Sequence, residues 1–400
     1  MSGTLQKAQR LVSLDAYRGF AMLAMVTDGL GLSKVAENFK GSRVWEFLSY
    51  QTSHVEWTGC AAWDLIQPSF MFITGVAIPY SYAARRGQGK AHAECLRHTA
   101  WRAFILVALG VFLRSNGSTM TYYVFEDVLS QIGLGYFFVY LFVNKGLVKQ
   151  ATFGIGILMG YWLLFALWPV LPANVDAKAM GLTADWRFFE GFAAHWNKGP
   201  NPAGYLDHWL LNVFPRLKPY TYNYGGYVTL SFVPSMATML VGLMAGEWLR
   251  REIPLAARVK RLAQASAVCF GIAFLLDGNI WPFADWNWTI APVVKRIWSP
   301  GWVIFSSGWT LLLLAVFIYV IDMKGWKKWA FPCIVVGLNP LAMYFLAHTI
   351  EGWLLQTVRT HFGQEIFSGV YGPIWAHVTG TFLLWLIILW MWRRRIFIRV

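Results

Sequence analysis

The feature that most constrains the fold of this chain is a series of long apolar blocks separated by short polar segments. A helix needs about 20 consecutive apolar residues to cross the hydrocarbon core of a bilayer. We predict ten such spans, at about residues 12–32, 64–84, 99–114, 127–143, 152–171, 228–248, 261–276, 302–322, 331–350 and 373–392. The predicted fold class is therefore all-α, a polytopic integral membrane protein with about ten transmembrane helices.

The composition supports a bilayer as the solvent. Of the 400 residues, 57% are hydrophobic and only 14% are charged, whereas a soluble domain carries about a quarter charged residues. The net charge of +14 is spread over short clusters between apolar blocks, so we expect no nucleic-acid partner. The cysteines have neither metal-type nor paired spacing, and we expect neither a metal site nor a disulfide framework. They are Cys60, Cys95, Cys269 and Cys333.

The basic residues indicate the orientation of the spans. Most of the 34 Lys and Arg fall in alternate loops, and basic residues near span ends stay in the cytoplasm. Both termini are therefore expected to be cytoplasmic. The first apolar block contains Asp15, Arg18 and Asp28, which the core of a cleaved signal peptide would exclude, so we expect this block to remain as a helix.

We expect a single transmembrane domain over residues 1–400, with one long extracytoplasmic loop at about 172–227. The loop is expected to be a structural lid. Alternatively, its rings could stack on a sugar, because the apolar faces of pyranose rings suit aromatic surfaces. These residues are Trp186, His195, Trp196, Trp209, Tyr220, Tyr222 and Tyr224.

Polar side chains inside the predicted spans are the candidates for function. A charge in the bilayer centre costs at least about 2.5 kcal/mol, so such a residue should face the bundle. Asp28 and Asp64 are predicted at the same outer face as His54, in the loop before the second span. Helix capping is the alternative for both aspartates. Interhelical hydrogen bonding is the alternative for the remaining polar residues, which are Arg114, Gln131, Asn339 and His348.

Several motifs then resemble one family of membrane enzymes. Residues 13–19, SLDAYRG, resemble the S-x-D-x-x-R-G start of the heparan-α-glucosaminide N-acetyltransferase-like family. Residues 54–75 match its H-x-x-W-x-G-x4-D-L-x2-P-x-F-x-F-x2-G pattern without a gap. Residues 128–132, 295–303 and 337–339 are similar to V-L-Q-R-I, K-x2-W-[ST]-P-x-[FYW]-V and G-x-N. Two departures are Asp28, where the family commonly has asparagine, and Gln131, where it has arginine.

The resemblance implies an acyl-CoA-dependent sugar N- or O-acyltransferase that uses acetyl-CoA, without a metal, and transfers to an amino sugar or another sugar acceptor. It implies His54 as the catalytic residue, and we expect Asp64 or Asp28 to orient its imidazole. We expect Arg18 and the inner arginines Arg85, Arg86, Arg102 and Arg250 to bind CoA. The alternatives are an intrahelical pair of Arg18 with Asp15 and, for the inner arginines, a role in membrane topology alone. The expected acceptor residues are Trp57, Gln131, Lys295, Asn339 and His348.

The resemblance also makes a homodimer and the inner membrane of a bacterium the expected assembly and location. The competing prediction is a transporter or flippase of a sugar-containing substrate, for which intramembrane charges would be equally natural.

Overall fold

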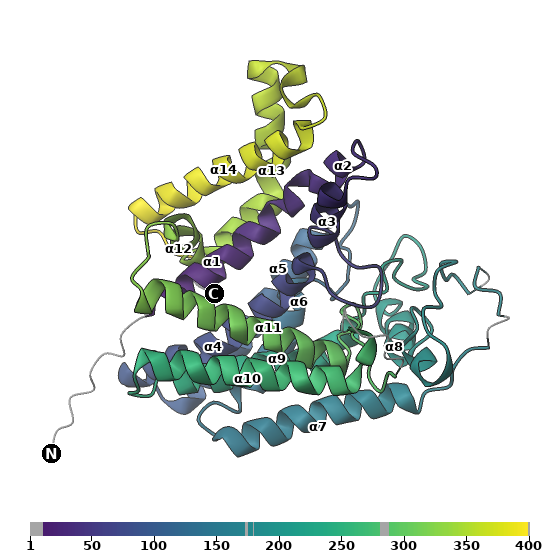
Figure 1. Ribbon diagram of the computed structural model, residues 1–400, viewed down its shortest axis with the longest axis horizontal. Coiled ribbons are helices and arrows are strands. Elements are labelled where there is room, and N and C mark those ends of the chain that lie inside the picture. Colours follow the sequence, from purple (N-terminus) through teal and green to yellow (C-terminus); the bar gives the residue numbers. More distant parts are fainter. Residues whose placement is uncertain (1–10, 173–174, 179, 281–287, 399–400) are drawn as a thin grey trace.

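The computed structural model describes residues 11–172, 175–178, 180–280 and 288–398, and within these ranges it is helical and contains no strand. Long helices run roughly parallel along the molecule, among them α7 (Leu147–Ala166), α10 (Leu255–Leu276) and α11 (Pro300–Phe317) (Figure 1). The all-α class and the membrane character predicted from the sequence agree with this arrangement.

Each predicted span overlaps a helix, but fewer helices meet the requirements for crossing a bilayer. By length and composition six described helices could span a membrane, or up to eight if two bent pairs each count as one span. The six include α5 (His92–Arg114), α9 (Phe232–Leu249) and α14 (Gly372–Arg393). Neither α4 (Ile66–Gly87) nor the short α6 (Val128–Tyr140) is among them. About ten spans therefore remains a prediction.

Two predicted spans are bent where single helices were expected. Residues 331–350 form α12 (Phe331–Gly337) and the start of α13 (Pro340–Phe362), which meet at 88°. The cause is local: Pro340 has no amide hydrogen, and a proline disfavours helical geometry at the residue before it, here Asn339 with φ −135° and ψ 47°.

The first span is also interrupted, near its C-terminal end. Helix α1 (Val12–Val26) is followed by a turn at Asp28–Gly31 and by α2 (Leu32–Ala36), with a 42° bend. Positive φ angles at Asp28, Gly29, Leu30 and Gly31 break the helix there.

Helix α12 packs against α1 through glycines in two of the recognised motifs. A Cβ at Gly19 would lie 1.7 Å from the carbonyl oxygen of Cys333, and a Cβ at Gly337 would lie 1.8 Å from that of Asp15. Such close backbone contact is typical of membrane helix pairs with small residues at their interface. The G-x-N motif and the S-x-D-x-x-R-G motif are therefore two sides of one interface.

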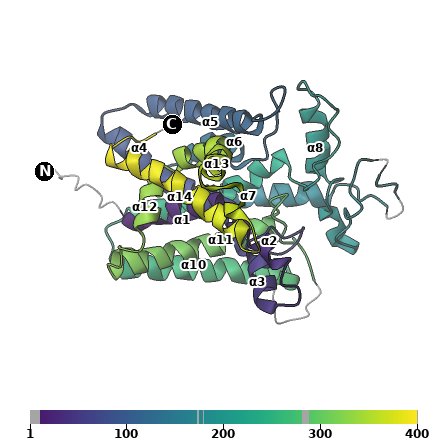
Figure 2. The same ribbon diagram turned by 90° about the horizontal axis from the view of Figure 1, so that it is seen from above.

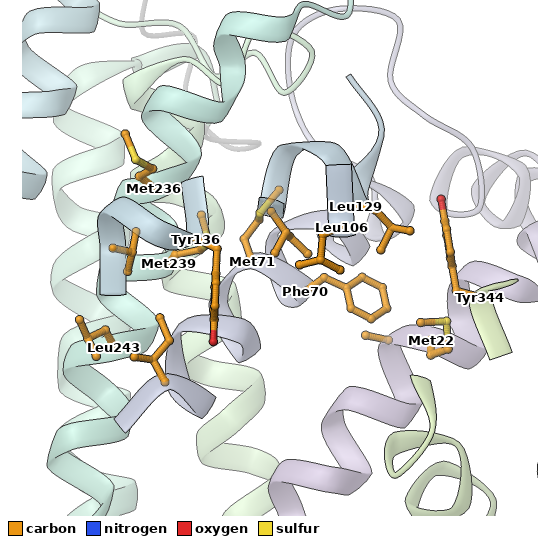
Figure 3. Packing of buried hydrophobic residues seen from close by; sticks show 14 of the residues in the cluster. Met22, Phe70, Met71, Leu106, Leu129, Tyr136, Met236, Met239, Leu243 and Tyr344 are labelled. Atoms are coloured by element: carbon orange, nitrogen blue, oxygen red, sulfur yellow. The ribbon is translucent and has the colours of Figure 1, made fainter. Parts of the chain in front are cut away.

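The core lies among α1, α4, α5, α6, α9 and α13, and is rich in flexible methionines. Met71 of α4 lies near Tyr136 of α6 and Met239 of α9 (Figure 3). A second part of the same cluster contains Met22 and Phe70. Both side chains also line a cavity of about 660 Å³ that is described below.

The two ends of the bundle differ. The long loop, with α8 (Pro202–Leu211), lies beyond one end, at the right of Figure 1. At the other end, Leu11 before α1 packs in one cluster with Leu249 at the end of α9, Leu262 of α10 and Ile321 beyond α11. Helix ends expected on the same membrane side thus lie together. Which side is cytoplasmic remains a prediction.

Candidate functional site

Three charged or titratable side chains meet at the loop end of the bundle. The Nδ1 atom of His54 lies 2.7 Å from Oδ1 of Asp64, and the Nζ atom of Lys295 lies 3.0 Å from the same oxygen. Asp64 and Lys295 are buried, whereas the His54 side chain is 39% exposed. We call these residues the His54 cluster.

Hydrogen bonds to main-chain carbonyl groups hold the two chain segments of the cluster together. Thr58 and Val294 form an isolated antiparallel bridge, and the Gly59 amide donates to the Val293 carbonyl at 3.0 Å. The guanidinium of Arg296 donates to the Val55 carbonyl at 3.1 Å. These bonds fix Lys295 beside the loop that carries His54.

Asp64 is held from both sides of its carboxylate. Its Oδ2 atom accepts the amides of Val55 at 3.2 Å and Ala61 at 3.1 Å. Asp64 therefore caps its own turn, η2 (Ala62–Leu65), and also contacts His54 and Lys295 through Oδ1. Asp64 thus combines the two roles considered for it, because it caps a helical turn and contacts the imidazole of His54.

The hydrogen-bond pattern determines which imidazole nitrogen is basic. Lys295 Nζ also lies 3.0 Å from His54 Nδ1, but an ammonium can only donate and an ionised carboxylate can only accept. Since the contact to Asp64 is shorter, we assign the Nδ1 hydrogen to it, which leaves the lone pair on Nε2. Burial lowers the pKa of His54, and the positive charges of Lys295 and Arg296 add to this effect while Asp64 opposes it. A neutral imidazole with a free Nε2 can act as a general base.

His54 and Lys295 open into a cavity of about 200 Å³, the His54 cavity. Sequence reasoning missed two carboxylates in its wall, Glu126 and Asp127. Asp127 is 6% exposed; its Oδ1 atom caps α6 by accepting the amides of Leu129 and Ser130, whereas Oδ2 has no hydrogen-bond partner within the described residues. In the sequence, the signal that could have identified them is that they are two adjacent carboxylates just before an apolar block.

A second cavity, of about 660 Å³, carries arginines on an apolar background, and we call it the basic cavity. Arg18, Arg85 and Arg102 line it, as do core residues such as Phe70. Its walls include Met22, Leu106, Leu129 and Tyr344, which are drawn at the right of Figure 3. Three residues line both cavities, so their side chains stand between the arginines and His54. They are Met25, Val128 and Tyr344.

Two of the predicted CoA arginines do not line the basic cavity. Arg86 donates to the Lys90 carbonyl at 2.7 Å, and Arg250 donates to the Pro79 carbonyl at 3.0 Å. Arg86 therefore binds the loop between α4 and α5, and Arg250, just after α9, binds a carbonyl within α4.

Most predicted acceptor residues have structural partners outside the His54 cavity. The Nε1 atom of Trp57 donates to the Trp196 carbonyl at 3.0 Å, and the amide of Gln131 donates to the Thr229 carbonyl at 3.1 Å. His348 contacts the Tyr344 carbonyl one turn earlier in its helix at 2.9 Å.

Asn339 and Asp28 also interact with residues other than His54. Asn339 donates to the Ile396 carbonyl at 2.6 Å and accepts the Ile398 amide at 2.9 Å, so it anchors the C-terminal segment. Asp28 is exposed in the turn after α1, and its charge acts on Glu351 and His377. Of the two aspartates expected to orient His54, only Asp64 contacts it.

The loop aromatics differ in burial, and His195, Tyr220 and Tyr222 are half-buried. Trp186 and Trp196 are buried, and Trp196 packs in one cluster with Trp57. Trp209 and Tyr224 are exposed. In the described part of the chain, no group of three or more His, Cys, Asp or Glu residues could hold a metal ion.

The chain is similar to two curated proteins along 92% of its length. It is 24% identical to heparan-alpha-glucosaminide N-acetyltransferase of Homo sapiens and 22% identical to the same protein of Mus musculus. The chain spans 58% of the length of each relative. No family model matches the chain. These relatives confirm the family resemblance that the motifs predicted.

Proposed function

We propose that the chain is a transmembrane acyltransferase that moves an acetyl group from cytoplasmic acetyl-CoA to an amino sugar or another sugar acceptor on the opposite side of the membrane. The observation that carries the proposal is that the His54 cavity and the basic cavity share Met25, Val128 and Tyr344 in their walls. The two similar acetyltransferases support the reaction class. We place the protein in the inner membrane of a bacterium.

In the proposed reaction, Arg18, Arg85 and Arg102 bind the phosphates of CoA, because guanidinium groups match phosphate oxygens well. The pantetheine arm extends between the core side chains toward His54. Arg86 and Arg250 are no longer proposed for this role, since backbone carbonyls engage both.

At the His54 cavity, Nε2 of His54 takes a proton from the acceptor as its nitrogen or oxygen attacks the thioester carbonyl. The C–S bond breaks, and the imidazolium returns the proton to the departing CoA sulfur. Asp64 orients the imidazole and stabilises its charged form, while Lys295 keeps Asp64 ionised at 3.0 Å. Glu126 and Asp127 offer acceptor oxygens to the sugar. An acyl-histidine intermediate in two steps is the alternative order of events.

The test is labelled acetyl-CoA with purified protein in nanodiscs, with and without glucosamine. We expect release of CoA that depends on the acceptor, and we expect His54→Ala to reduce it about 10²- to 10⁴-fold, the usual contribution of a general base. His361→Ala, an exposed histidine at the end of α13, is the matched control and should keep full activity.

Two results would contradict the proposal. One is substantial transfer by the His54→Ala protein when its folding and CoA binding are intact. The other is accumulation of a sugar in vesicles without CoA, which supports the transporter class instead.

A further inference from the structure

A lateral groove on the membrane-facing side lies next to the His54 cluster. It is walled by α1, the start of α4, α11 and the short helix α3 (Arg43–Gln51), and has a volume of about 670 Å³. Its lining is mostly apolar, with the polar side chains of Thr27, Gln51, Thr52 and Ser69 among the exceptions. The residues used below are Phe20 and Ala24 of α1, Phe47 of α3, Trp63 of the turn η2, Ile66 at the start of α4, and Trp309 of α11.

The groove opens toward the bilayer. Phe20, Phe47 and Trp309 line it and are exposed. In a protein that spans a membrane, exposed rings at such positions contact hydrocarbon chains. Helix α1 lies beside α11, with α3 near their loop end (Figures 1 and 2). The groove is therefore open to lipid along its length.

One end of the groove lies at the level of the His54 cluster, where Cys60, Ala61 and Trp63 line it beside Asp64, and the other end reaches deeper along α11. Trp309 lies in the third turn of α11, a helix that begins at Pro300 shortly after Lys295. Helix α3 has no buried residue and exposes Val44, Phe47 and Tyr50. A short amphipathic helix of this kind is suited to the membrane–water interface. The mouth of the groove is thus at the interface on the His54 side.

The groove and the His54 cavity share part of their walls. Trp63 and Ile66 line both, and Asp64, between them in the sequence, contacts His54. A molecule with an apolar chain in the groove would therefore have its polar head beside the His54 cavity. This continuity distinguishes the groove from other lipid-facing surfaces of the bundle.

We propose that the groove binds the hydrocarbon chain of the acceptor, so that the acceptor is a lipid-linked sugar that enters sideways from the outer leaflet. The inference rests on the proposed function, because it assigns the substrate class of the same site. The chain supplies binding energy through buried methylene groups, and the sugar occupies the His54 cavity with the acceptor group toward Nε2.

The probes for the test are alkyl glucosaminides with chains from methyl to octyl, used below their micellar concentrations with protein in nanodiscs. We expect KM for acetyl transfer to be at least tenfold lower for the octyl than for the methyl compound. Ala24→Trp, which fills the groove, should bring the KM ratio of the methyl and octyl compounds, measured in the same variant, close to one. Ile272→Trp, at an exposed position of α10, is the control and should preserve the difference.

Binding of the same compounds without acetyl-CoA separates the two proposals. Suppose that no acceptor gives CoA release, but that the unsubstituted protein binds the octyl compound at least tenfold more tightly than the methyl compound. If Ala24→Trp abolishes this difference in binding, the proposed function is wrong, but the groove still binds a hydrocarbon chain. Equal KM and equal binding for both chain lengths would overturn the lipid site. So would a shift from dimer to monomer in Ala24→Trp without loss of the chain-length effect, because a second copy of the chain would then fill the groove.

Discussion

The His54 cavity and the basic cavity are built in opposite ways. In the His54 cavity, two chain segments are joined through backbone hydrogen bonds, and Asp64 makes four contacts that fix its carboxylate. In the basic cavity, the arginines share the wall with flexible core side chains such as Met22 and Met25. Rigid positioning suits proton transfer, which needs groups held at hydrogen-bond distance, whereas adaptable walls suit a long, flexible substrate.

The largest effect should follow from removing the charge at the centre of the rigid cavity. In Asp64→Asn, the imidazolium loses its counter-charge and Lys295 is left buried without an anion. We expect kcat to fall at least about 100-fold and stability to fall by about 3–5 kcal/mol, the cost of breaking a buried pair. Thermal unfolding and kcat should be measured together.

The double variant Asp64→Asn, Lys295→Met separates these two losses. Removal of the buried ammonium should restore most of the stability, because the unpaired charge is gone, but it should restore no activity. Recovery of kcat in the double variant would show that Asp64 acts only through folding.

The basic cavity offers a matched pair of neighbouring arginines. Arg85 lines the cavity and lies 2.6 Å from His98, whereas Arg86 donates to the Lys90 carbonyl. Arg85→Gln should raise KM for acetyl-CoA roughly 10- to 100-fold, since a hydrogen bond to a charged group contributes about 1.5–3 kcal/mol. Arg86→Gln should leave it nearly unchanged. Equal effects in the two variants would show that the cavity is not the CoA site.

The pH dependence of kcat/KM should be determined by the His54 cavity alone. Burial lowers the pKa of His54 from its usual value of 6.5, so the base is neutral at pH 7 and becomes protonated only at lower pH. We expect kcat/KM to be flat near neutrality and to fall about tenfold per pH unit below the lowered pKa. Acetyl-CoA binding should not follow this profile. A decline that begins above pH 6.5 would contradict the assigned environment of His54.

The sequence predicted which residues matter in the His54 cavity better than it predicted which of them are in contact. Asp64 and Asp28 were both predicted at the same face as His54, and Asp28 could not be eliminated because its turn geometry depends on positive φ angles that the sequence alone does not specify. Lys295 is 231 residues from Asp64, and only tertiary packing brings them together. The Asn339-Pro340 pair, by contrast, was a visible signal for the bend after α12 that the apolar pattern concealed.

The basic cavity was predicted with less accuracy for a geometric reason. Adjacent helical residues point about 100° apart, so a run such as Arg85-Arg86 places one side chain in the cavity and the other outside it. Without the direction in which α4 faces its neighbours, the sequence cannot say which. Residues of the His54 cavity wall such as Asp127 were missed because helix capping explains them equally well.

The smallest predicted effect tests whether the basic cavity depends on helix packing. Gly337 lines this cavity, and a Cβ there would lie 1.8 Å from the Asp15 carbonyl oxygen. Gly337→Ala should push α12 away from α1, which raises KM for acetyl-CoA several-fold and lowers the thermal unfolding temperature, while the pH profile set by His54 stays the same. Gly352→Ala on α13 has open space around its Cβ and should change neither quantity. If Gly337→Ala shifts the pH profile instead, the two cavities are mechanically coupled, and the contrast between a rigid and an adaptable site does not hold.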